Sequence, residues 1–183
     1  MSIVRFTAIA ALLIGSINFL QAADTLELDA ENSKIEFVGK KPDGKHSGGF
    51  KKFTAKAIAD FEEPTNGLLE IEIDATSLFS DDEKLTNHLK NPDFFDVRKH
   101  PKINFKSTKL IVHEEQGKAK IVGDLTLLDR KIELEVPCTV SVDEKLVKVV
   151  ANFELDRTKW GMTYGVGKIS NDVEVKAHLV FKR

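Results

Sequence analysis

Side chains that could bind a metal ion or transfer a proton are few in this chain and widely spaced. The histidines are His46, His88, His100, His113 and His178. No two of them stand four residues apart, and none forms a His-x-His pair. The spacing therefore predicts neither a pair of ligands on one helix face nor a compact metal site on a strand.

His88, Asp96 and His100 come closest to a chemical site, because they share one polar stretch. Two alternatives therefore stay open: an enzyme that acts on a lipid-like substrate, and a metal site. The chain has no Gly-x-Ser-x-Gly nucleophile elbow, no phosphate-binding glycine-rich loop before a helix and no paired cysteines. We therefore expect a binding protein without catalytic residues, bound metal or cofactor, rather than an enzyme.

Cys138 is the only cysteine, so the chain cannot form an intramolecular disulfide. It lies in an alternating apolar run over residues 132–142. No base or positive charge shares its face of that run. We expect a small buried hydrophobic side chain rather than a reactive thiol.

Residues 80–107 are the one stretch that does not read as β-strand. Ser80 and Glu83 form a capping-box pattern that predicts a helix start, and Asn91-Pro92 predicts its end. The helix carries one apolar face, and an aromatic turn follows it. Such a helix, set among strands, is expected to act as a lid on a barrel.

The rest of the chain alternates apolar and polar residues, as half-buried antiparallel strands do. Residues 69–75 and 173–181 are the clearest cases, while residues 42–49 are typical of a glycine-rich loop. An irregularity is expected near Ser107, and a bulge or edge position at Pro137. The pattern predicts an all-β fold of about eight antiparallel strands closing into a barrel, with the short helix after the fourth strand.

The first 23 residues predict a secretory signal peptide. Arg5 precedes an uncharged apolar run over residues 6–20, and cleavage is expected after Ala22 or Ala23. The mature domain would then be residues 24–183, exported to the periplasm or secreted, with no membrane-spanning segment left after cleavage. A formal net charge of −2 without a basic block argues against nucleic acid as a partner. The oligomeric state stays open, a homodimer included.

Three stretches resemble the YceI-like family of exported lipid-binding proteins. They are HLKNPDFFDVRKHPKINFKST at 88–108, GDLTL at 123–127 and FELDRTKWGMTYG at 153–165. The resemblance extends over essentially the whole mature chain. It implies an extended, lipocalin-like antiparallel barrel whose apolar tunnel holds an amphiphile with an isoprenoid, quinone or fatty-acid-derived tail.

The predicted barrel suggests which residues would contact such a ligand. Small inward residues would leave a channel, and apolar or aromatic residues would form its wall, its lid and its rim. The small residues are Ala55, Ala57, Ala59, Gly123, Ala151 and Ala177. The predicted ligand-binding residues are Phe37, Phe53, Leu85, His88, Leu89, Phe94, Phe95, Ile103, Phe105, Phe153, Trp160, Met162 and Tyr164.

Overall fold

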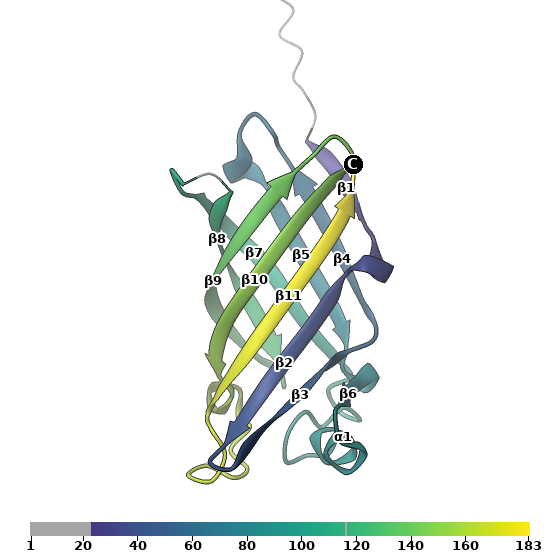
Figure 1. The fold of residues 1–183 in the computed structure, drawn as a ribbon, viewed down its shortest axis with the longest axis vertical. Helices are drawn as coiled ribbons and strands as arrows, with labels where there is room; N and C mark the ends of the chain where they lie inside the picture. Colours follow the sequence, from purple (N-terminus) through teal and green to yellow (C-terminus); the bar gives the residue numbers. More distant parts are fainter. Residues whose placement is uncertain (1–22, 116) are drawn as a thin grey trace, which may run out of the picture.

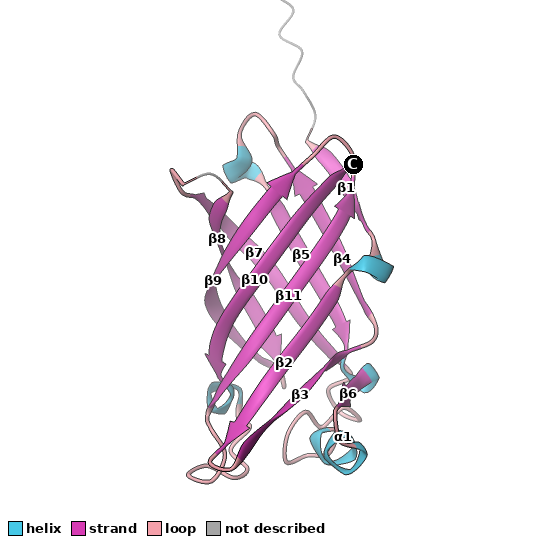
Figure 2. Cartoon of the chain, in the orientation of Figure 1, coloured by secondary structure: helices cyan, strands magenta, loops and turns pink. Residues whose placement is uncertain are grey.

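The computed structural model describes residues 23–115 and 117–183, and apart from Ala23 the expected signal peptide lies outside this part of the chain. Strands make up most of it (Figure 2). The strands are β1 (Asp24–Leu28), β2 (Lys34–Lys41), β3 (Gly44–Phe50), β4 (Phe53–Ala59), β5 (Leu68–Asp74), β6 (Leu78–Ser80), β7 (Lys102–Val112), β8 (Lys118–Leu127), β9 (Arg130–Val142), β10 (Leu146–Asp156) and β11 (Asp172–Lys182). Helix α1 (Glu83–Leu89) and 3₁₀ turns η1 (Ala30–Asn32), η2 (Pro64–Asn66), η3 (Ala75–Ser77) and η4 (Arg157–Trp160) complete the fold.

The strands form a closed antiparallel barrel of eight long segments, which confirms the predicted fold class. Three of the segments are each broken into two strands: β1 with β2, β3 with β4, and β5 with β6. Each half pairs antiparallel with the matching half of the next segment: β1 with β4 and β2 with β3, then β4 with β5 and β3 with β6. Strand β11 closes the barrel because it pairs with both β1 and β2. Helix α1 lies at the end of the barrel opposite the C-terminus, which we call the lid end (Figure 1).

Six short strands therefore precede the helix, where the sequence predicted four. Strand β3 accounts for much of the difference, because its Gly48-Gly49 pair was read as part of a loop. A Cβ atom on Gly48 would lie 2.4 Å from the carbonyl oxygen of Phe79, and one on Gly49 2.7 Å from that of Ile35. The glycines let the backbone of β3 pass close to β2 and β6 and are not a sign of disorder.

The irregularity expected near Ser107 is confirmed as a shift of register between Ser107 and Lys109 in β7. The Ser107 hydroxyl is buried there and accepts a hydrogen bond of 2.8 Å from the backbone N–H of Leu69. A side chain thus satisfies a buried strand N–H beside the bulge.

Pro137 lies where the pairing of β9 with β10 stops, which confirms the predicted edge position. That pairing runs only from Val142 to Cys138 on β9, whereas β9 stays paired with β8 past Pro137. The N–H of Val140 donates to the carbonyl of Gly117 on the β8 side. Strand alternation then directs the nitrogen of Pro137 toward β10, and a proline nitrogen has no hydrogen to donate.

Helix α1 is capped by Asp82 and not by the predicted Ser80. The Asp82 carboxylate accepts a 2.7 Å hydrogen bond from the N–H of Leu85, three residues on. Ser80 still belongs to β6, and its hydroxyl instead donates to the carbonyl of Asp82 at 2.7 Å. The helix ends at Leu89, just before Asn91-Pro92 as predicted. In the described residues, no helix has the length and apolar character needed to cross a membrane.

Replacing Asp82 by alanine is expected to lower the free energy of unfolding by about 0.5–2 kcal/mol, because the N–H of Leu85 loses its acceptor. Urea unfolding followed by circular dichroism measures this change. Asp82→Asn is the control, since asparagine caps helices about as well as aspartate. An asparagine variant as destabilised as the alanine variant would show that the cap is not the cause.

An apolar cavity as the candidate functional site

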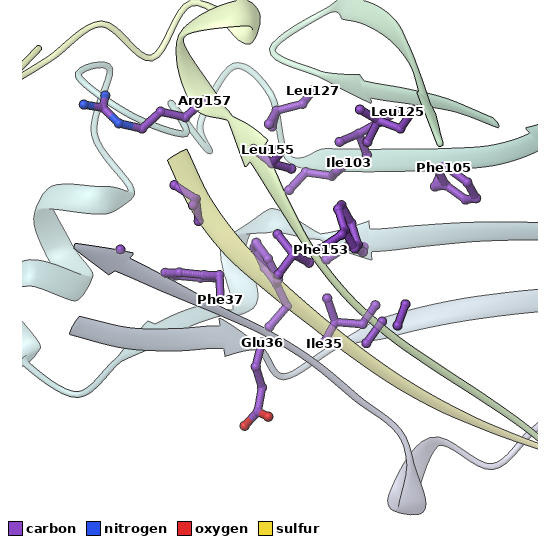
Figure 3. Close-up of a pocket in the computed structure, with 18 of the residues that line it drawn as sticks. Ile35, Glu36, Phe37, Ile103, Phe105, Leu125, Leu127, Phe153, Leu155 and Arg157 are labelled. Carbon is purple, nitrogen blue, oxygen red and sulfur yellow. The ribbon is translucent and has the colours of Figure 1, made fainter. Parts of the chain in front are cut away.

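The barrel encloses an apolar cavity of about 420 Å³. Inward side chains of most strands line it, because alternate residues of a strand point to the same face. Figure 3 shows Ile35, Ile103, Phe105, Phe153 and Leu155 among them. The volume falls within the range of about 300–1,000 Å³ that is typical of small-molecule sites.

Nine of the thirteen predicted ligand-binding residues line this cavity. They are Phe37, Leu85, Leu89, Phe94, Phe95, Ile103, Phe105, Phe153 and Met162. Phe53, His88, Trp160 and Tyr164 are not among the lining residues. Four of the nine, Phe37, Ile103, Phe105 and Phe153, lie on strands, where the direction of each side chain follows from its parity.

Aromatic side chains from three elements line the lid end of the cavity. The rings of Phe37 in β2, Phe50 in β3 and Phe95 in the turn after α1 lie 5.8–6.3 Å apart between centroids. Leu89 and Phe94 are buried and pack with Leu78 into a small core beneath the helix. Phe50 also lines the cavity, and the sequence does not predict it, because the glycines before it are typical of a loop.

His88 lies beside these aromatic side chains and does not line the cavity. Its ring packs edge-on against Phe94, with centroids 5.1 Å apart, and against Tyr164 at 4.9 Å. Its Nε2 lies 2.9 Å from the Asp93 carboxylate. His88 therefore joins helix α1 to the loop that follows η4 and does not reach the cavity.

Trp160 and Phe53 contribute to the core of the barrel. Trp160 is 1% exposed, and its indole N–H donates to the carbonyl of Leu125 in β8 at 3.2 Å. Phe53 is partly buried and packs against the main core. Both side chains therefore stabilise the wall from positions outside the cavity lining.

The polar residues of the alternative enzyme site do not converge. His100 Nδ1 lies 3.1 Å from the carboxylate of Asp129, whereas Asp96 faces Lys99 at 3.6 Å and His88 faces Asp93. Each of the three thus contacts a different side chain. Across residues 23–115 and 117–183, no group of three or more His, Cys, Asp or Glu side chains could hold a metal ion.

The predicted small residues have different roles. Ala151 and Ala177 line the cavity and face each other across β10 and β11. Gly123 does not widen the channel as predicted, because the ring of Phe105 fills the space beside it. A Cβ atom on Gly123 would lie 2.6 Å from that ring. The predicted inward alanines of β4 do not line the cavity, although Ala57 is buried.

Cys138 is buried, and burial raises the pKa of its thiol to about 11. At pH 8 the native thiol is therefore almost entirely protonated, and the thiolate is the reactive form. We expect Ellman's reagent to modify Cys138 at least tenfold more slowly in the native protein than in guanidinium chloride. Native labelling as fast as that of the unfolded chain would contradict the burial of Cys138.

The fold and the cavity together define a closed β-barrel with an apolar interior. Residues 26–181 match the model of the YceI-like domain, and the chain belongs to this family. A UPF0312 protein of Vibrio parahaemolyticus is 34% identical over 80 residues, 44% of this chain and 42% of that protein, so the match spans less than half the length of that relative.

Two solved structures share the fold. BcnA of Burkholderia cenocepacia has a TM-score of 0.79 at 24% identity, over 84% of this chain and 99% of that one. A polyisoprenoid-binding domain from Saccharophagus degradans has a TM-score of 0.69 at 13% identity, over 87% and 98%. At these identities the likeness extends to the fold alone.

Proposed function

We propose that this protein is exported and sequesters or carries an amphiphilic lipid in the barrel. The observation that carries the proposal is the barrel cavity of about 420 Å³, lined mainly by aliphatic and aromatic side chains. A tail that leaves water gains about 25 cal/mol per Å² of apolar area buried. Sequestration of this kind needs no chemical step.

The fold neighbour from Saccharophagus degradans, described as a polyisoprenoid-binding domain, supports an isoprenoid-type tail. An isoprenoid quinone or a fatty-acid-like chain would suit the same apolar wall. The apolar segment near the N-terminus supports export to the periplasm or the medium. A lipid that leaves its membrane needs a protein cavity when it crosses an aqueous compartment.

Mass spectrometry of organic extracts tests this function. The full chain is expressed, the exported form is purified without detergent, and the extract is compared with that of an unrelated exported protein. We expect one amphiphile per chain, recovered chemically intact. A protein that carries no amphiphile, and that also fails to bind an added apolar dye such as N-phenyl-1-naphthylamine, would overturn the proposal.

A further inference from the structure

Arg157 is a buried cation with an unused hydrogen-bond donor. The residue is 4% exposed. Its Nε donates to the carbonyl of Ser170 at 3.0 Å, and its Nη1 donates to the carbonyl of Met162. Its Nη2 is buried and has no hydrogen-bond partner in the described part of the chain. Buried hydrogen-bond donors nearly always have an acceptor, so a buried donor without one requires an explanation.

The charge of Arg157 is also uncompensated. The neighbouring carboxylate of Asp156 is turned to Thr158, whose N–H and hydroxyl it binds at 2.9 and 2.6 Å. Among the ion pairs of residues 23–115 and 117–183, none includes Arg157. Burial lowers the pKa of the guanidinium, against a smaller opposing effect of Asp156. An arginine nevertheless stays protonated near neutral pH, and a buried charge without a partner is costly.

Arg157 lines the apolar cavity. Figure 3 shows its side chain at one side of the labelled residues and Phe105 at the other. Other charged side chains border the same cavity but are more accessible. Lys40 is paired with Glu154, and His46 with Asp81, and all four of these side chains are at least 40% exposed. Arg157 is therefore the buried cation of this site.

We propose that Arg157 binds the anionic head group, a carboxylate or a phosphate, of the amphiphile that occupies the cavity. An anionic oxygen would offset the buried charge and, after a turn of the guanidinium toward the cavity, would satisfy Nη2, which has no accessible surface in this structure, while the tail fills the apolar remainder. Charge-assisted hydrogen bonds are among the strongest that proteins make. This inference rests on the proposed lipid-binding function and adds the chemical class of the head group.

Ligands with one tail and different head groups test the proposal. Oleate, oleyl phosphate and methyl oleate are each titrated against N-phenyl-1-naphthylamine bound to the full mature chain. We expect the better anion to bind roughly 10- to 100-fold more tightly than the ester, the range for one hydrogen bond to a charged group. The two anions decide between carboxylate and phosphate. Equal affinity of ester and anions would overturn the proposal, whereas no binding of any of the three would instead overturn the lipid-binding function.

Variants then attribute the preference to Arg157. Arg157→Met should abolish it and leave methyl oleate within about threefold of its original affinity, because a flexible apolar side chain keeps much of the packing. Arg157→Lys should restore part of the preference, since it keeps the charge. Arg98→Met is the matched control, because Arg98 is exposed and does not line the cavity, and it should change nothing. A preference that survives in Arg157→Met, or disappears in Arg98→Met, would overturn the proposal.

Discussion

Replacing both Ala151 and Ala177 by phenylalanine is expected to abolish ligand binding in a protein that remains folded. The two alanines face each other on β10 and β11, and both line the cavity. Two added rings would occupy much of a space of about 420 Å³. We expect the affinity for an apolar dye to fall at least tenfold. Overpacking costs about 1–3 kcal/mol where a core is already full, and less where there is empty space to fill.

The same two strands offer a matched control. Val150 and His178 also face each other across β10 and β11, one residue away, and Val150 is 47% exposed. Phenylalanine at both of these positions adds the same two rings to the outer surface. Dye titration and thermal unfolding are measured for both double variants. Unchanged dye binding in the folded Ala151/Ala177 variant would show that the cavity is not the binding site.

Trp160→Ala is expected to destabilise the protein by about 3–5 kcal/mol, the usual cost of truncating a large buried aromatic side chain. Trp160 is 1% exposed and has no direct part in lining the cavity. Truncation would leave a void in the core and deprive the carbonyl of Leu125 of its indole donor. The effect on stability should therefore exceed any direct effect on ligand contacts.

Urea unfolding measures this loss, with far-ultraviolet circular dichroism as the signal, because Trp160 is the only tryptophan. Trp160→Phe keeps most of the apolar contact and loses the hydrogen bond, so it should fall between the wild type and alanine. Tyr164→Ala lies in the following loop and is the exposed control, since Tyr164 is 46% exposed. A Trp160→Ala variant no less stable than Tyr164→Ala would contradict the role given to the indole.

The sequence by itself determined the barrel and most of its inner wall. Period-two alternation places every second residue of a strand on one face, so Ile103, Phe105 and Phe153 could be placed before any contact was known. Local signals also located the helix, the bulge at Ser107 and the edge at Pro137. Each of these depends on chemistry within a few residues of the chain.

Only the tertiary structure decided which of these residues share a space. The tight passage of β3 at Gly48 depends on the backbone of β6, thirty residues away in the sequence. Trp160 was predicted to contact the ligand, but its indole N–H donates to the carbonyl of Leu125 in a distant strand. Arg157 stands in a charged and polar run of the sequence, residues 156–159, yet its burial and its unpaired Nη2 arise from the folding of residues 162–170 around it. Desolvation and hydrogen-bond satisfaction depend on neighbours in space, and no local pattern contains them.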